Sequence, residues 1–220
     1  MVINLKVRYL ASFNYIRLIL FLGLGAYFLI GCQTKEPLPI LSKQTQIDGQ
    51  LRYESIPAFH FVDQDSQQIN LGTFEGKVYV VDFFFTSCPT ICPVLAQQML
   101  RIYQHFEHDD RVLLLSHTID PKRDSVEKLA HYAKNLGVSS NKWHFVTGDK
   151  EAIFDIGDDY FNIILENEDA PMGLDHSGRL VLVDRDKHIR SFCNGTDPKE
   201  VDRFIKDIEL LLKTYEATLD

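Results

Sequence analysis

The chain has 220 residues, of which 45% are hydrophobic and 25% are charged, and its formal net charge is -8. This length suits one domain with additional segments, and the composition excludes an intrinsically disordered chain. The acidic excess argues against nucleic acid as a partner.

The first 31 residues differ from the rest of the chain. They carry three charged side chains, all cationic, and contain an apolar run at 18–30 that ends in Leu29-Ile30-Gly31-Cys32. We expect residues 1–31 to be a signal segment, because the run is shorter than the ~20 residues that cross a bilayer. Its ending resembles a bacterial lipoprotein cleavage box, which implies that Cys32 is lipidated. The alternative is an uncleaved anchor. Either interpretation places the domain in the bacterial cell envelope, on the periplasmic side of a membrane.

The segment after the apolar run is polar. Residues 32–55 contain Pro37 and Pro39 and show no sustained periodicity, so we expect a tether, with the folded domain at 56–215. Within residues 59–71, apolar pairs flank a polar stretch, which predicts a short hairpin ahead of the core.

A core strand and a helix are predicted next. Residues 78–85 are almost all apolar, aromatic or β-branched, which is typical of a strand covered on both faces in a parallel or mixed sheet. Pro93 suits the first turn of a helix. The apolar residues of this helix recur at helical spacing and predict a face packed on the sheet: Leu95, Met99, Ile102 and Phe106.

Strand and helix signals continue to alternate towards the C-terminus. They predict a strand at 112–115, helices starting with a cap at Asp124 and near Ile153, a hairpin of strands at 180–183 and 189–193, and a last helix opened by Asp197. We therefore expect an α/β fold with a central mixed sheet flanked by helices.

Two cysteines directly follow the core strand, in Ser87-Cys88-Pro89-Thr90-Ile91-Cys92-Pro93. A helix N-terminus lowers a thiol pKa and so increases the thiolate that nucleophiles and soft-metal ligands require. We expect Cys88 and Cys92 to share this effect and to meet on one side of the first turn, either in a disulfide or around a metal. The spacing alone does not decide between these.

His176 is a third candidate ligand, in a loop before the strand at Leu180. A single loop histidine is more often a solvated side chain. Two thiolates with an imidazole nevertheless suit copper as Cu(I) and as Cu(II), whereas a structural zinc site normally has four such ligands.

Three motifs together resemble the Sco/SenC family. They are residues 83–93, Ile119-Asp120-Pro121-Lys122-Arg123-Asp124 and Asp175-His176-Ser177, and the agreement in order and spacing extends over roughly residues 55–213. Members of this family are copper-binding, thioredoxin-like assembly factors for cytochrome c oxidase. One departure is Thr90, where many members carry an acidic residue, and it weakens any inference about partner contacts at that position.

The resemblance implies a thioredoxin-like fold with an added N-terminal hairpin and a hairpin before the C-terminal helix. It also implies that Cys88, Cys92 and His176 are the ligands of one copper ion per chain. The implied task is delivery of copper to the dinuclear centre of oxidase subunit II, or reduction of the cysteines of that centre with the help of a thiol reductant.

Two alternatives to copper delivery remain open. In a thiol:disulfide oxidoreductase, Cys88 would attack a substrate disulfide and Cys92 would resolve the mixed disulfide. In a non-catalytic sensor or scaffold, the pair would form a structural disulfide. We favour copper because His176 has no obvious use in simple thiol exchange.

Three further residues carry expectations. Asp82 is the one charged residue of the core strand, and its distance from Cys88 is similar to that of the buried aspartate beneath the thioredoxin cysteines. We expect it to accept protons from the thiols, or else to be a strand residue bonded to a neighbouring hydroxyl or backbone group. Cys193 is expected to be a small buried thiol, and His117 to lie at the surface or the edge of the core.

Overall fold

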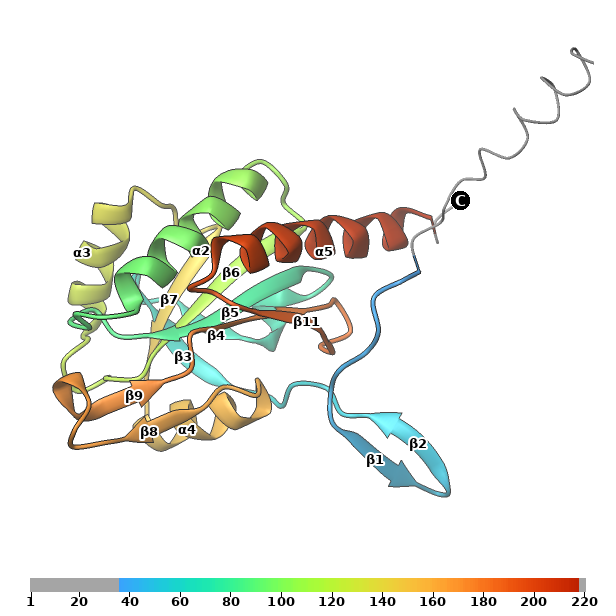
Figure 1. The fold of residues 1–220 in the computed structure, drawn as a ribbon, viewed down its shortest axis with the longest axis horizontal. Helices are drawn as coiled ribbons and strands as arrows, with labels where there is room; N and C mark the ends of the chain where they lie inside the picture. Colours follow the sequence, from blue (N-terminus) through green and yellow to red (C-terminus); the bar gives the residue numbers. More distant parts are fainter. Residues whose placement is uncertain (1–35, 218–220) are drawn as a thin grey trace, which may run out of the picture. The chain divides into compact units, whose positions relative to one another are not determined.

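The structure, a computed structural model, describes residues 36–217 and has a seven-stranded mixed sheet at its centre (Figure 1). In sheet order the strands are β11 (Ile189–Asn194), β10 (Arg179–Val183), β5 (Val78–Phe84), β6 (Val112–Thr118), β7 (Trp143–Thr147), β3 (His60–Asp63) and β4 (Gln68–Asn70). β5, β6 and β7 are parallel, and the outer strands pair antiparallel. Every residue of β5 and β6 is buried, which agrees with the mainly apolar sequence of β5 and with the apolar first four residues of β6.

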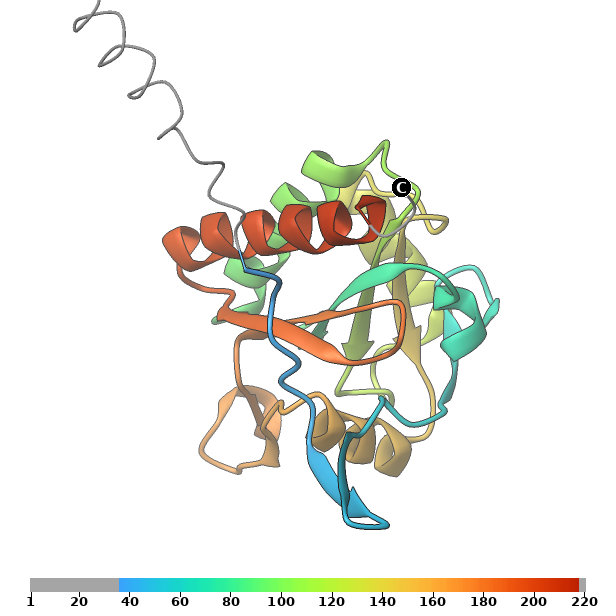
Figure 2. The ribbon, with the colours of Figure 1, turned by 90° about the vertical axis from the view of Figure 1, so that its right-hand side faces the viewer.

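Helices cover both faces of this sheet. α2 (Cys92–Phe106), α3 (Val126–Leu136) and α5 (Pro198–Glu216) lie on one face, and α4 (Lys150–Asp159) lies on the other (Figures 1 and 2). The connections from β5 to β6 and from β6 to β7 step in the same direction across the sheet. Crossovers between parallel strands are almost always right-handed, which accounts for α2 and α3 sharing a face. The predicted apolar stripe of α2 is buried in the core.

The two predicted hairpins are present. β3 and β4 form one hairpin before the core strand, and β10 and β11 form the other before α5. Sequence analysis missed β7, although turn-forming residues at 137–141 precede its five residues. It also placed the cap of α3 at Asp124, whereas Ser125 is the N-cap and its Oγ accepts a hydrogen bond from the Lys128 amide at 3.3 Å.

The tether was expected at 32–55, and the part of it that the structure describes, 36–55, contains a hairpin. β1 (Gln44–Ile47) and β2 (Gln50–Tyr53) form an antiparallel hairpin, and both turn residues, Asp48 and Gly49, have positive φ, 51° and 77°. An Asp-Gly pair tolerates this geometry, and it is the turn signal that sequence analysis overlooked.

A strap, defined here as residues 38–43, attaches this hairpin to the domain. The Leu41 amide donates to the Ile189 carbonyl at 2.7 Å, and the Ser42 hydroxyl accepts from the Ile189 amide at 2.9 Å. The Arg190 guanidinium also donates to the carbonyls of Leu38 and Pro39. The compact unit accordingly begins at Pro37. Residues 1–31 and Cys32 lie outside the described residues, and no helix within the described range is long and apolar enough to span a bilayer.

Candidate metal centre

Two segments, far apart in the sequence, supply the candidate ligands. Cys88 lies in the loop that follows β5, and its amide donates to the Phe85 carbonyl at 3.2 Å. Cys92 is the first residue of α2. His176 ends β9 (Leu174–His176), which pairs with β8 (Ile164–Glu166) so that His176 lies opposite Ile164. Figure 1 shows the start of α2 and β9 at the same end of the domain.

The structure brings these three side chains together. The two sulfur atoms and an imidazole nitrogen all lie within 4.8 Å of one another, and Cys92 Sγ is 3.4 Å from His176 Nε2. The exposed fractions are 9% for Cys88, 3% for Cys92 and 7% for His176. Among the described residues, no other group of three or more cysteine, histidine or acidic side chains has this geometry. His176 was expected in a loop, but it is the last residue of β9, where it is buried beside the thiols and is not a solvated side chain.

A hydrogen bond fixes the state of the imidazole. His176 Nδ1 lies 3.2 Å from the carbonyl oxygen of Ser177. A carbonyl only accepts, so Nδ1 carries the proton and the lone pair of Nε2 is directed at the thiols. Metal-binding histidines commonly donate their second ring N–H to a carbonyl in this way. Burial lowers the pKa of His176, which keeps the ring neutral.

The two thiols have pKa values displaced in opposite directions, although sequence analysis expected both to be lowered. Burial raises the pKa of Cys88, but hydrogen bonds from Thr90, at 3.4 Å, and from Cys92 outweigh it and leave the pKa below its usual value. Burial, followed by the hydrogen bond to Cys88, raises the pKa of Cys92 well above its usual value. The reason is position: Cys92 begins the helix but is enclosed by the core, whereas Cys88 precedes it in the loop.

Asp124 holds the cysteine loop in place. Its fully buried carboxylate accepts from the Thr86 amide at 2.9 Å, from the Thr86 hydroxyl at 2.5 Å and from the Thr118 hydroxyl at 2.7 Å. Lys128 Nζ lies 3.1 Å away as its ion-pair partner. The Asp124 side chain thus connects the segment after β5 to the end of β6. Its contact on the β5 side, Thr86, lies two residues before Cys88.

Asp82 lies beneath the centre in β5. Burial raises its pKa to about 7, and its carboxylate accepts a hydrogen bond from Ser116. Ser116 in turn accepts from the Trp143 indole N–H at 2.8 Å. The charge of Asp82 also contributes to the raised pKa of Cys92. Asp82 thus bonds a neighbouring hydroxyl, and its role as a proton acceptor for the thiols stays a prediction.

Cys193 and His117 take no part in the centre. Cys193 is a free, buried thiol on β11. His117 was expected at the surface or the edge of the core, but it is fully buried. Its ring stacks on Phe83 with centroids 5.0 Å apart and meets the edge of Phe61 at 5.1 Å. An aromatic surrounding of this kind leaves no signal in the neighbouring sequence.

The sequence matches a known protein family over most of the described domain. A sequence model described as SCO1/SenC matches residues 48–213. The chain belongs to the SCO1/SenC family. Among its relatives, the SCO2-like protein of Rickettsia felis is 31% identical over 199 residues, covering 85% of this chain and 92% of the relative. The SCO1 protein homolog of Bacillus subtilis is 29% identical over 166 residues, covering 74% of this chain and 86% of the relative.

Solved structures of Sco proteins share the fold. A SCO1/SenC family lipoprotein from Bacillus anthracis matches with a TM-score of 0.66 at 24% identity, over 72% of this chain and 95% of that protein. ScoI from Arabidopsis thaliana, solved with copper bound, matches with a TM-score of 0.59 at 24% identity, over 71% of this chain and 99% of that protein. These likenesses confirm the expected thioredoxin-like fold.

Proposed function

We propose that this protein is a copper chaperone that binds one copper ion through Cys88, Cys92 and His176. The single observation that carries the proposal is that a neutral imidazole, oriented by its bond to the Ser177 carbonyl, directs Nε2 at two thiols. The donors are two soft sulfurs and one nitrogen, which suit copper in both of its common oxidation states.

The relatives support copper as the cargo. Sco proteins from Arabidopsis thaliana and Bradyrhizobium japonicum have been solved with copper bound. A relative in Stutzerimonas stutzeri, 30% identical over 144 residues, is described as a putative copper-binding protein. The donor set of this chain fits such a cargo without a fourth ligand.

The properties of the two thiols indicate how copper is taken up. A thiol loses its proton when it becomes a metal ligand. Cys88, with the lower pKa, supplies thiolate first, and Cys92 loses its proton once the metal offsets the cost of a buried charge. In this proposal Asp82, whose pKa lies at about 7, accepts a proton released at the centre.

The proposed recipient is subunit II of cytochrome c oxidase, at its dinuclear copper centre. A Sco protein of 24% identity, with a TM-score of 0.66, is described as a member of a family of cytochrome c oxidase assembly proteins. The proposed location is the periplasmic side of a bacterial envelope membrane, with a lipid on Cys32. The Bacillus anthracis relative is likewise described as a lipoprotein.

Metal analysis tests the proposal. The wild-type protein, purified reduced and loaded anaerobically with Cu(I), is expected to hold one copper per chain after a competing chelator is added. Cys88→Ser, Cys92→Ser and His176→Ala should each lose copper to the chelator, with the largest loss in the cysteine variants because thiolates bind Cu(I) most strongly. Equal copper in all four proteins contradicts the proposal. Cys193→Ser is the matched control and should keep its copper.

A second function, thiol:disulfide exchange, is favoured by the asymmetry of the cysteine pair. The Cys88 thiolate would attack a substrate disulfide to form a mixed disulfide. The Cys92 thiol would lose its proton and attack Cys88, releasing the substrate as a dithiol and leaving a Cys88–Cys92 disulfide that a thiol reductant reopens. Reduction of an oxidised subunit II peptide that persists with chelator present and in His176→Ala would favour this function over copper delivery.

A further inference from the structure

The β1–β2 hairpin has unusually exposed apolar side chains. Of the nine large hydrophobic residues that are exposed in the described part of the chain, four fall between residues 41 and 53: Leu41, Ile47, Leu51 and Tyr53. Leu51 is the most exposed, at 71%. In the hairpin register Leu51 lies opposite Gln46 and Tyr53 lies opposite Gln44, so Leu51 and Tyr53 share one face. Ile47, beside the turn, lies on the other face.

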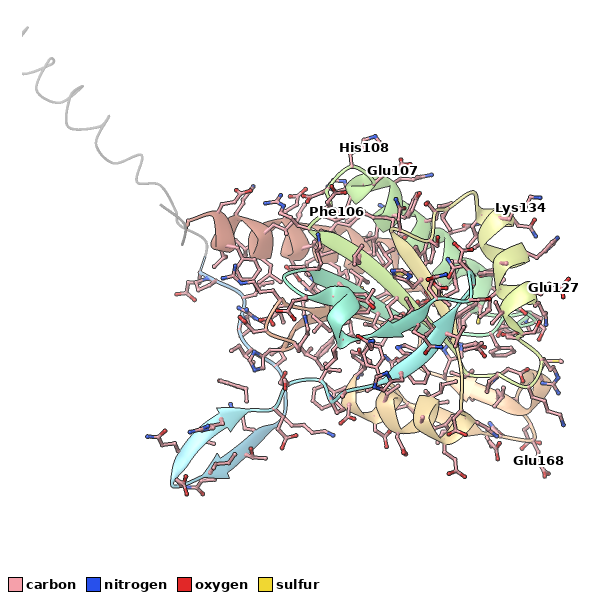
Figure 3. All side chains as sticks on the ribbon, turned by 180° about the vertical axis from the view of Figure 1, so that it is seen from behind. Phe106, Glu107, His108, Glu127, Lys134 and Glu168 are labelled. Carbon is pink, nitrogen blue, oxygen red and sulfur yellow. The ribbon has the colours of Figure 1, made fainter. Side chains whose placement is uncertain are left out.

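The hairpin projects from the domain. Figures 1 and 2 show it directed away from the sheet and its helices, and Figure 3 shows its side chains extending on both sides of the ribbon. Seven of its eight strand residues are exposed. Its one ring contact with the described domain is Tyr53 against His188, with centroids 6.4 Å apart. A two-stranded hairpin is marginally stable alone in water, so a surface that covers its apolar residues would stabilise it.

Chain length limits how far the hairpin can lie from a membrane. In the proposed envelope location, residue 32 would lie at a bilayer surface, whether Cys32 is lipidated or the apolar run at 18–30 is retained as an anchor. Leu41 follows nine residues later and is bound to Ile189 of the domain. Nine residues span at most about 32 Å. The strap, and the hairpin that begins three residues after Leu41, therefore stay close to the lipid.

The strap and the metal centre are at opposite ends of the sheet. Ile189 pairs with Val183, and Val183 pairs with Tyr79 near the start of β5. Cys88 follows the end of β5. A hairpin that contacts the bilayer would consequently direct the metal centre away from it.

We propose that the β1–β2 hairpin is a membrane-contact element, in which the face that carries Leu51 and Tyr53 enters the headgroup region of the bilayer. The cations Lys43 and Arg52 are matched by the anions Asp48 and Glu54, so the contact is apolar and does not select anionic lipids. This inference rests on the proposed envelope location. It does not depend on copper binding.

Tryptophan quenching tests the contact. The chain has one tryptophan, Trp143, which is 1% exposed and serves as an internal background. Full-length Leu51→Trp, extracted from membranes and reconstituted into phosphatidylcholine vesicles, is compared between ordinary and acyl-brominated lipid. We expect the emission of the new tryptophan to fall at least two-fold in brominated vesicles. Leu165→Trp, on β8 near the metal centre and 54% exposed in the wild type, is the matched control and should be unaffected.

Two outcomes overturn the proposal. One is unchanged emission of Leu51→Trp in brominated lipid. If iodide in the aqueous phase then quenches this tryptophan at low protein density but not at high density, a second copy of the chain covers the hairpin, and the membrane contact is also overturned. The other is equal quenching of Leu165→Trp. Amide hydrogen exchange over residues 44–53 of the wild-type protein provides a check without substitution, since exchange should be slower in vesicles than in dilute detergent.

The copper content of the same samples separates the two proposals. One copper ion per chain, without quenching of the Leu51→Trp emission by brominated lipid, overturns the membrane contact alone. Quenching without copper overturns the proposed function alone.

Discussion

Asp82 and His117 lie on neighbouring parallel strands, β5 and β6, and burial shifts their pKa values in opposite directions. Burial raises the pKa of Asp82 to about 7 and lowers that of His117 to about 3. In both cases it disfavours the charged form. The two groups therefore give the folding stability opposite dependences on pH.

Asp82 should make the protein less stable as pH rises. Between about pH 4 and pH 7 the folded state binds more protons at this residue than the unfolded state, so the free energy of unfolding falls with pH. We expect Asp82→Asn to remove this fall, with a slope of at most about 1.4 kcal/mol per pH unit. Urea unfolding of the reduced proteins at pH 5 and pH 7.5 measures it. Asp149→Asn, at the exposed cap of α4, is the control. The same slope in wild type and Asp82→Asn would contradict the raised pKa.

Copper uptake offers a separate measurement on Asp82. If its carboxylate accepts a proton from the thiols, the pH dependence of Cu(I) affinity should change in Asp82→Asn between pH 5 and pH 8. A pH dependence that is unchanged would leave Asp82 as a hydrogen-bonded strand residue.

His117 should act in the opposite direction. The unfolded state binds more protons at His117 between about pH 3 and pH 6.5, so stability is lost as pH falls through this range. Both ring nitrogens also lack a hydrogen-bond partner. His117→Phe should therefore gain stability over the wild type as pH decreases from 7 to 4, by up to about 1.4 kcal/mol per pH unit. Thermal or urea unfolding across this range tests it, with the exposed His108→Gln as the control. If the difference in free energy of unfolding between His117→Phe and the wild type does not change with pH, His117 does not cause the loss of stability at low pH.

At the scale of elements, the ends of β5 and β6 support the metal centre through Asp124. Removing its carboxylate leaves Thr86, Thr118 and Lys128 without their shared acceptor, so Asp124→Ala should lower the free energy of unfolding by about 3 kcal/mol. We also expect Cu(I) affinity to fall about 10- to 100-fold, as is usual when a residue that orients metal ligands is lost.

The control for Asp124→Ala is Asp149→Ala. Asp149 caps α4 by accepting from the Ala152 amide, and its loss should cost about 1 kcal/mol with unchanged copper affinity. Competition titrations with a Cu(I) chelator compare the two variants. If Asp124→Ala binds copper as tightly as the wild type, the carboxylate supports the fold and not the centre.

Elements with a strong local signal could be predicted from the sequence, and those that depend on distant contacts could not. The apolar run of β5 and the stripe of α2 identified both elements because each is covered by the core along its length. Asp124 has a suitable residue type for a helix cap, but its position between two strand ends makes it a buried acceptor. The burial of His117 depends on rings from β3 and β5, far apart in sequence.

At the scale of the whole molecule, copper should stabilise the folded chain. His176 meets the two cysteines only in the folded state, so Cu(I) binds that state more tightly than the unfolded chain. A ligand at 100 times its dissociation constant then adds about 2.7 kcal/mol to the free energy of unfolding. Thermal unfolding of the reduced protein with and without Cu(I) measures this increase. His176→Ala should show a smaller one, and a copper-independent melting temperature in the wild type would contradict the site.

The motifs indicated which three residues would form the centre, but the sequence could not assign their states. The pKa difference between Cys88 and Cys92 arises from burial and from the Thr90 hydroxyl, and the imidazole tautomer arises from the Ser177 carbonyl. These depend on atomic positions, which spacing in a sequence does not specify.

If the chain is exported, as the proposed envelope location requires, the separation of the ligands along the chain affects when copper can be acquired. His176 follows Cys92 by 84 residues. β10, which begins after His176, inserts beside β5. A chain still emerging from a secretion channel would thus display the two cysteines without the imidazole or the neighbouring strand. Full occupancy has to await almost complete translocation, so immature molecules would hold the ion only weakly.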